Sequence, residues 1–507
     1  MQVLISRYIE QGYLGAYSDN INNHNSKNQH ISKGLRYYFI IDNAKTFQKF
    51  IPQNRLLKKT KKHYTYPELK SIEYETTTFF ENSGYPFSSI QYIPNKLIDS
   101  TFFGVLKIDK GDYFPTDSIY QRGNCRINNK TIKRYYNVQR QPGFSVKNIE
   151  TGDKRLNYLP FVSTSKPSTP LFKTNACILY TYHNIQKANV FDGLLGLVPN
   201  EKTQENDYIL TGNFNLRLYN AFKLTDKFIL ELDLPGHARQ KLDIQSEIPY
   251  FGGLPFGINQ DFHLYKKDST FLNIVYEPGI IFNFGITGKV ILFSHFYNSN
   301  SITNITNNEL PTSINAKGLG ITFSNSTFHT TTNPQQGYSL NLKTHYSNKA
   351  IKNKNGNQSS HDTYVVNFEL EKYIKIAPKL IALIAPQLNI ILSEIITPNE
   401  QLRIGGIHTI RGVTEESILA DKFTASTFEL RYMFEERSNI NIFYDAGYYS
   451  SNSNNSYIKD YPMGFGLGLN LGTKNGVLNI SYAFDRQFGK FSGASNGKVH
   501  IGYISIF

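Results

Sequence analysis

The chain has 507 residues, a formal net charge of +14 and 40% hydrophobic residues. Its mean hydropathy of −0.39 is too polar for a bundle of membrane helices, and no stretch approaches the roughly 20 apolar residues that a spanning helix needs. Lysine and arginine are spread along the chain, without a nucleic-acid-binding motif around them. The positive charge therefore indicates solvated surface, and we expect no nucleic-acid partner.

The first part of the chain, residues 1–185, mixes helical and strand patterns. Apolar residues at helical spacing predict a helix over residues 3–16, and a similar pattern returns about seventy residues later. The further predicted elements are strands at 35–41, 101–108 and 118–127, helices at 128–136 and 146–159, and a strand at 176–182. This repetition predicts small α+β modules: a partial one at 1–45, then 46–115 and 116–186.

The start of the chain bears on its location. The first fifteen residues do not resemble a signal peptide, because their apolar run is three residues long and Glu10 follows soon after. The first module also lacks its opening strand and helix. We therefore expect the sequence to begin partway through a domain. The two cysteines, Cys125 and Cys177, are too few for a disulfide framework; a bond between them and two separate buried thiols both remain open.

From Phe191 onward, apolar and polar residues alternate, so that each predicted strand has two distinct faces. In residues 227–234 the apolar face consists of Phe228, Leu230, Leu232 and Leu234, opposed by Glu231 and Asp233. A soluble sandwich alternates too. However, these runs are about ten residues long, and their polar face carries charges and amides, as the wet lumen of a membrane barrel does.

The alternating runs give about sixteen strands, an even number as closure of a single-chain bacterial barrel requires. They begin near residues 191, 207, 226, 239, 255, 269, 287, 315, 337, 361, 379, 423, 439, 462, 476 and 498. The predicted fold is therefore mainly β: a 16-stranded antiparallel transmembrane β-barrel over 187–507, preceded by the α+β modules. Polar connections near 297–313, 348–362 and 450–461 fit extracellular loops.

The longest connection, residues 393–422, is not simply polar. It contains Gly405-Gly406, a pair that allows positive φ and close backbone approach. Arg411 and Gly412 follow, directly after an apolar residue. A glycine turn with a stray arginine is the alternative interpretation.

The next two strands supply partners for Arg411. Alternation places Glu429 and Asp445 on the polar face, opposite Phe428 and Tyr444. A guanidinium can pair with carboxylates on two adjacent strands. We therefore predict a lumen latch, in which the loop folds inward and Arg411 bridges Glu429 and Asp445.

Several sequence motifs resemble one family. They are the Gly-Gly…Ile-Arg-Gly loop, the strands Phe-Glu-Leu-Arg-Tyr and Phe-Tyr-Asp-Ala-Gly, the Phe-Asp-Gly-Leu-Leu-Gly entry to the barrel, Tyr-Lys-Lys-Asp at 265–268, and the terminal Phe507. Together they resemble the BamA/TamA superfamily of outer-membrane assembly and translocation proteins, most closely its Bacteroidetes-type members. The resemblance implies an inward loop in the barrel and periplasmic POTRA domains before it. Val413 stands where the family usually has an aromatic residue.

The resemblance also implies a weak seam between the first and last strands, near residues 191–198 and 498–507. The residues that we assign to this seam and to a C-terminal targeting signal are Gly193, Gly196, Gly502, Tyr503 and Phe507. The last strand alternates apolar residues up to its terminal aromatic, as such signals do, with Ser505 as one interruption.

The function that the resemblance implies is insertion: the modules receive unfolded outer-membrane proteins in the periplasm, and the barrel inserts them into the outer membrane through its seam. Outer-membrane lipids and accessory lipoproteins are candidate partners. The alternatives are a protein or lipoprotein translocation pore of the same superfamily and, from a different class, a structural or diffusion porin. Twelve histidines lack metal-ligand spacing, and no catalytic motif occurs, so we expect no enzyme activity, metal or cofactor.

Overall fold

The computed structural model describes residues 2–23, 26–47, 63–199, 208–234, 239–267, 270–302, 313–328, 333–352, 357–407, 409–453, 456–473, 476–491 and 497–505. The chain forms two compact units: residues 1–122 with 136–152 and 167–181, and residues 123–135 with 153–166 and 182–507. Among the described helices, none is both long and apolar enough to cross a membrane.

The helices are short and lie mostly before the barrel. They are α1 (Gln2–Glu10), α2 (Ala44–Phe47), α4 (Tyr66–Glu81), α5 (Asn129–Tyr135) and α6 (Val146–Asn157), with the 3-10 turn η1 (Phe251–Gly253) inside the barrel sequence. The strands of this first part are β1 (Tyr17–Asn23), β2 (Ser26–Ser32), β3 (Tyr38–Ile41), β4 (Tyr64–Thr65), β5 (Ser89–Ile98), β6 (Thr101–Asp109), β7 (Thr116–Gln121), β8 (Val162–Thr164), β9 (Thr169–Lys173), β10 (Ala176–Thr181) and β11 (His183–Ile185).

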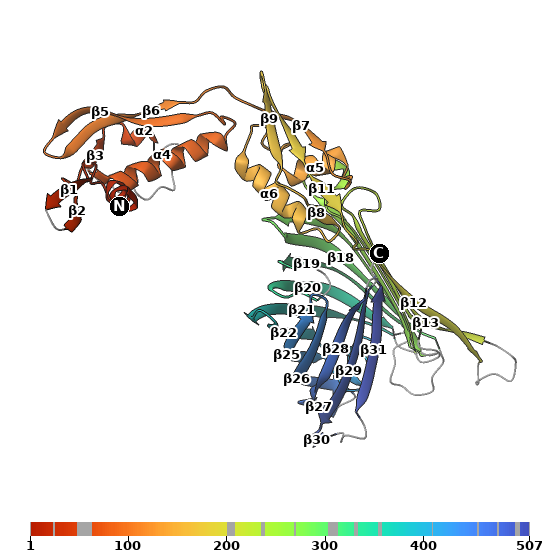
Figure 1. Ribbon diagram of the computed structural model, residues 1–507. Coiled ribbons are helices and arrows are strands. Elements are labelled where there is room, and N and C mark those ends of the chain that lie inside the picture. The colour runs from red at the N-terminus through yellow and green to blue at the C-terminus, as the bar shows by residue number, and fades with distance from the viewer. Residues whose placement is uncertain are drawn as a thin grey trace. The chain divides into compact units, whose positions relative to one another are not determined.

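The best-formed module packs α4 on a four-stranded sheet of order β4-β3-β6-β5 (Figure 1). The helix begins where Glu68 accepts hydrogen bonds from the backbone N–H and the hydroxyl of Thr65, at 2.8 and 3.0 Å, which satisfies donors that a helix start leaves open. Its buried side chains, Leu69, Ile72 and Phe80 among them, face the sheet. This apolar stripe is what holds the helix against the sheet.

One predicted boundary moves. We placed the end of the first module at residue 45, but β3 pairs in parallel with β6, Tyr38 opposite Thr101. The strand therefore belongs to the same sheet as β4, β5 and β6, and the boundary lies before Tyr38. The sequence could not reveal this, because a parallel pair joins segments far apart in the chain.

The next stretch of the chain forms a three-stranded sheet of order β7-β10-β9, in which β7 and β10 run parallel, within the first unit, and a separate β8–β11 pair within the second unit. Its strands and helices follow the order that the sequence predicts: strand, two helices, then further strands. Cys125 and Cys177 are free thiols, both buried. Burial raises the pKa of each thiol to about 11, so both remain protonated and unreactive at neutral pH.

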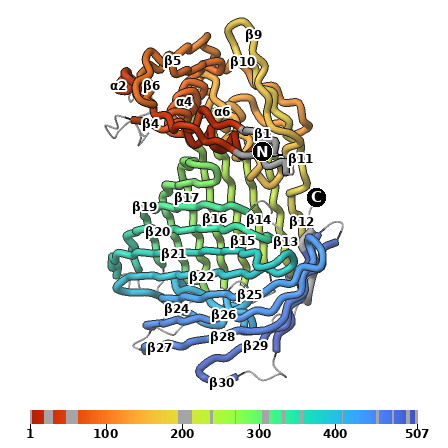
Figure 2. Tube along the Cα trace, turned by 60° about the vertical axis from the view of Figure 1, so that its left-hand side comes forward, coloured from red at the N-terminus to blue at the C-terminus, as the bar shows by residue number. Residues whose placement is uncertain are grey.

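The barrel is one large antiparallel sheet whose strands pair in chain order (Figure 2). Its sixteen long strands are β12 (Val190–Pro199), β13 (Tyr208–Tyr219), β14 (Lys227–Leu234), β15 (Arg239–Ile248), β16 (Gly257–Lys267), β17 (Phe271–Phe284), β18 (Gly288–Ser301), β19 (Ser313–Ser326), β20 (Gly337–Lys352), β21 (Gln358–Ala377), β22 (Leu380–Ser393), β25 (Lys422–Glu435), β26 (Ser438–Ser453), β28 (Met463–Thr473), β29 (Gly476–Gln487) and β31 (Lys498–Ser505). Two short strands, β27 (Ser456–Asp460) and β30 (Lys490–Phe491), extend it. This confirms the predicted fold class.

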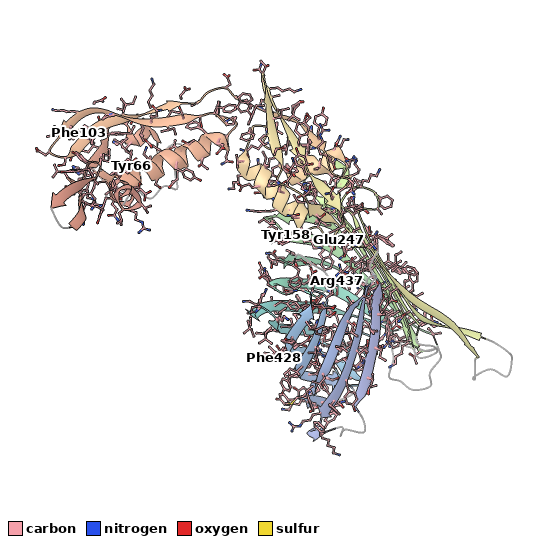
Figure 3. All side chains as sticks on the ribbon, viewed as in Figure 1. Tyr66, Phe103, Tyr158, Glu247, Phe428 and Arg437 are labelled. Carbon is pink, nitrogen blue, oxygen red and sulfur yellow. The ribbon has the colours of Figure 1, made fainter. Side chains whose placement is uncertain are left out.

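The wall is apolar outside and polar inside. On β25, Phe428 and Tyr432 are 46% and 51% exposed, whereas Glu429 between them is 8% exposed. Phe428 is labelled in Figure 3. The next strand repeats the pattern, with Ile442 outside and Asp445 inside. Large apolar residues exposed on alternate positions suit lipid, and enclosed charges suit a wet lumen.

Three predicted loops are partly strand. Strands β18, β20 and β26 continue into the polar segments near 297–313, 348–362 and 450–461 that we expected to be extracellular loops. A strand that rises beyond the membrane no longer needs an apolar outer face, so hydropathy alternation stops before the hydrogen-bonded ladder does.

The outward face generates a prediction about stability. Ile442→Arg should lower the barrel's free energy of unfolding by up to about 2–4 kcal/mol, because it places a cation on the lipid-facing side of β26. Tyr457→Arg is the matched control, since Tyr457 is also exposed but lies on the short extension β27; it should have little effect. Urea unfolding in phospholipid vesicles measures both. Equal losses in the two variants would contradict the assignment of the lipid face.

Candidate functional site

The connection between β22 and β25 folds into a small structured unit. Two short strands within it, β23 (Leu402–Ile404) and β24 (Ile418–Ala420), pair antiparallel. Its apolar side chains form a buried cluster with residues of β25 and β26; the members are Ile404, Ile410, Val413, Ile418, Ala420, Phe423, Ala425 and Tyr449. Val413 is fully buried there, so the residue that departs from the family's aromatic serves as part of the loop's core.

The predicted glycines shape the loop tip. Gly405, Gly406 and Gly412 have φ of 120°, 92° and 92°, a region that other residues rarely adopt. A Cβ at Gly405 would lie 1.9 Å from the carbonyl oxygen of Thr414, and one at Gly412 would lie 2.6 Å from the backbone of Phe484. The tip therefore closes on itself and then approaches the barrel wall closely.

Arg411 meets Asp445 of β26 in a bidentate pair. Its Nε and Nη2 donate to the two carboxylate oxygens at 2.8 and 2.7 Å, and its backbone N–H donates at 3.1 Å. The hydroxyl of Thr427 donates to the same carboxylate at 2.8 Å. Asp445 is 1% exposed, so these donors replace nearly all of the hydrogen bonds that water would make to its carboxylate.

Glu429 of β25 is the second partner. It accepts from Arg411 Nη1 at 3.2 Å and from Nε of Arg431 at 2.7 Å. The Arg411 guanidinium also lies 3.5 Å from the ring centre of Phe443, which covers a face that water would otherwise solvate. Arg411, Glu429 and Asp445 are thus in direct contact, and Arg431 joins them.

A second ion pair holds the base of the loop. Lys349 of β20 is 1% exposed, and its Nζ lies 2.8 and 3.0 Å from the two carboxylate oxygens of Glu400. It also donates to the carbonyl of Ile395 at 2.6 Å. Glu400 in turn accepts from the backbone N–H and hydroxyl of Thr397. The loop is therefore fixed at its start as well as at its tip.

Sequence reasoning missed Lys349, Glu400 and Arg431. Alternation could have identified Arg431, which is two residues from Glu429 and so shares its face. Lys349 was hidden because its segment was interpreted as an extracellular loop, where a lysine is unremarkable. The pairing with Glu400 joins residues that only the fold brings together.

The predicted seam residues lie on the two terminal strands of the sheet. Gly193 and Gly196 pair with β13, opposite Phe214 and Thr211. Gly502 and Tyr503 pair with β29, opposite Asn479 and Leu478. Strands β12 and β31 are neighbours, yet no ladder pair joins them among their described residues. Phe507 lies outside the described residues.

A cavity of about 540 Å³ connects the latch with the seam strands. Arg411 and Glu429 line it on the latch side, and Asp192 of β12, Gly502 and Tyr503 of β31 line it on the seam side. Two predicted residues from each group, Arg411 and Glu429 of the latch and Gly502 and Tyr503 of the seam, therefore face one space.

Comparison with known proteins identifies the barrel. Residues 259–502 match the model of the Omp85 superfamily domain. The chain carries an Omp85 superfamily domain. This confirms the BamA/TamA resemblance at the level of the Omp85 superfamily, and the chain is an outer-membrane β-barrel protein. Proteins of this kind are assembly or transport proteins and not enzymes, which supports the prediction of no enzyme activity. The Bacteroidetes-type detail stays a prediction.

Solved structures share the fold at low sequence identity. CdiB from Escherichia coli is 12% identical with a TM-score of 0.59, over 100% of this chain and 97% of that one. CdiB from Acinetobacter baumannii is 15% identical with a TM-score of 0.57, over 91% and 86%. BamA from Haemophilus ducreyi lacking POTRA domains 1–3 is 14% identical with a TM-score of 0.50, over 93% and 99%. No curated protein matches the chain.

The latch makes a testable prediction about stability. Arg411→Ala should lower the free energy of unfolding by about 3–5 kcal/mol, because it leaves the buried Asp445 and Glu429 carboxylates short of a partner. The matched control is Arg217→Ala, since Arg217 and Glu231 also pair at 2.8 Å but are 40% and 41% exposed. The control should cost about 0–1 kcal/mol. The charge swap Arg411→Glu with Asp445→Arg should recover part of the loss. Unchanged stability of Arg411→Ala in urea unfolding would rule out the latch.

The base of the loop gives a second prediction. Lys349→Met should cost about 3–5 kcal/mol, because the Glu400 carboxylate stays buried without its cation. Adding Glu400→Gln removes that charge and keeps an acceptor for Thr397, so the double variant should be more stable than the single one. Protease cleavage within residues 394–421 would report loosening of the loop. If the losses in unfolding free energy of Lys349→Met and Glu400→Gln simply added in the double variant, the two side chains would not act as a pair.

Proposed function

We propose that this protein is an outer-membrane assembly factor, which receives unfolded β-barrel proteins in the periplasm and inserts them through the seam between β12 and β31. The observation that carries the proposal is the pair of neighbouring terminal strands without a described ladder pair, facing the same cavity as the latch. Strand edges with free N–H and C=O groups can template an incoming strand. Insertion needs no nucleotide, because a client gains stability as it folds into lipid.

The N-terminal module with α4 supports the capture step. Strand β5 is at the end of its sheet, and its outer half exposes Ile93, Leu97 and Ile98. A cavity of about 400 Å³ lies beside it, lined by apolar side chains that include Leu69 and Phe102. An extended client segment could add to this edge by main-chain hydrogen bonds and place its apolar side chains in the cavity.

The edge is also protected against indiscriminate pairing. The register between β5 and β6 shifts between Pro94 and Lys96, and a bulge beside a proline, which has no N–H to donate, interrupts the ladder. On α4, Glu73 accepts the backbone N–H of Tyr92 at 3.0 Å. We infer that a client pairs with only part of the β5 edge. Outer-membrane lipids and accessory lipoproteins remain candidate partners of the barrel and the modules.

Two other functions share parts of this architecture. A translocation pore would use the same barrel to export a protein or lipoprotein, and the fold alone does not separate it from an insertase. A diffusion porin is less consistent with a loop anchored inside the lumen at both Arg411 and Lys349.

Locking the seam tests the proposal. Asp192→Cys and Gly502→Cys, in a chain whose native cysteines are replaced by alanine, place one thiol on each seam strand; a Cβ at Gly502 meets open space. The oxidised protein should insert an unfolded barrel client into vesicles at least about tenfold more slowly, and a reductant should restore the rate. The matched control is Asn215→Cys with Glu231→Cys, which are register partners on β13 and β14. Undiminished insertion by the locked seam would overturn the proposal.

Depletion of the protein in cells separates insertion from export. Loss of many different outer-membrane barrels would identify an insertase. Loss of a single secreted protein, with the barrels retained, would identify an exporter and replace the proposal.

A further inference from the structure

Three side chains with metal-ligating groups meet on the inner wall, on strands other than those of the latch. Glu277 of β17, His295 of β18 and His345 of β20 each offer one ligand atom, and these atoms lie within 4.8 Å of one another. Glu277 and His295 are buried, at 3% and 8% exposure. Twelve histidines scattered through the sequence gave no sign of this site, because its members come from three strands.

The sheet is built so that these side chains can meet. His295 lies opposite Gly318 of β19, and His345 lies opposite Gly320. The rings therefore extend across a strand that has no side chain between them, and they stack with centroids 4.1 Å apart. A Cβ at Gly320 would lie 2.7 Å from the Cβ of His345. Glycine at this position is what allows the two imidazoles to approach.

Hydrogen bonds within the wall leave the cluster incomplete. His295 Nδ1 contacts Glu277 Oε1 at 2.8 Å, and the other carboxylate oxygen pairs with Lys343. The Nδ1 of His345 is buried and has no hydrogen-bond partner among the described residues. A buried polar atom without a partner is destabilising. A cation at the centre of the cluster would use this nitrogen lone pair.

A second carboxylate–histidine–lysine group on the wall differs from this cluster in its number of histidines. Asp243 contacts His263 at 2.8 Å and Lys241 at 2.9 Å, which repeats the carboxylate, histidine and lysine of the cluster. Among the described residues, that group has no second histidine. The extra imidazole of His345 converts an ordinary ion-pair network into a set of two imidazoles and one carboxylate.

We propose that Glu277, His295 and His345 bind one divalent transition-metal ion of the zinc type. Two histidines and one glutamate are a ligand set that zinc uses with a further open position, and imidazole favours such ions over magnesium or calcium. Lys343 stays on the second carboxylate oxygen and opposes binding by its charge. The ion ties β17, β18 and β20 together inside the barrel, independently of the proposed insertion activity.

Calorimetric titration of the full chain in detergent micelles with Zn²⁺, after chelator treatment, tests the proposal. One ion should bind per barrel, and His345→Ala should weaken binding by more than about tenfold, since the loss of even an outer partner of a metal ligand usually costs 10–100-fold. His263→Ala is the matched control and should bind as the unchanged protein does. Lys343→Gln keeps all three ligands and should tighten binding, because it removes the competing cation.

The folded state of each variant is checked by its heat-modifiable migration in gels, and Lys343→Gln keeps the test informative if His345→Ala does not fold. Three results would overturn the proposal: no Zn²⁺ binding to the unchanged protein, equal weakening by His263→Ala and His345→Ala, or binding that is weakened by Lys343→Gln. Loss of zinc binding in His345→Ala with normal client insertion would support the site and leave the proposed function standing.

Discussion

The guanidinium of Arg411, whose side chain is 14% exposed, fixes the position of the loop on which the rest of the site depends. Arginine stays charged at any physiological pH, so the loop can enter the lumen only where that charge is compensated. Asp445 offers a bidentate contact and Glu429 a second carboxylate. Both carboxylates are themselves buried, so the cation and the carboxylates depend on each other. Removing one partner leaves an uncompensated buried charge, which destabilises the fold more than the intact ion pair stabilises it.

Shape confines the loop as strictly as charge does. A Cβ at Gly464 of β28 would lie 2.1 Å from the carbonyl oxygen of Arg411, and one at Gly447 of β26 would lie 2.4 Å from Ile410. The wall therefore lacks side chains where the loop backbone meets it. Combined with the anchor between Lys349 and Glu400, this close fit makes the loop a part of the barrel's interior and not a mobile insertion.

Local patterns predicted the barrel well, and pairings between distant segments escaped prediction. All sixteen long strands begin within three residues of the predicted starts, because alternation is a property of each strand alone. Glu429 and Asp445 were identified because alternation assigns each residue of a strand to a known face, and Arg411 because it follows an apolar residue and precedes Gly412 in the longest connection. Lys349 with Glu400, and His295 with His345, depend on which strands are neighbours and in what register, information that no single segment contains.

The loop also links the latch to the last strand. Lys498 of β31 donates from its Nζ to the hydroxyl of Thr414 at 2.8 Å, only three residues along the chain from Arg411. Strand β31 has a full ladder on its β29 side and no described ladder pair with β12. On the seam side, side-chain contacts such as this one therefore hold β31 in place where backbone hydrogen bonds do not. A loop fixed by Arg411 therefore supports one wall of the seam, and a shift at its tip would change the support of β31.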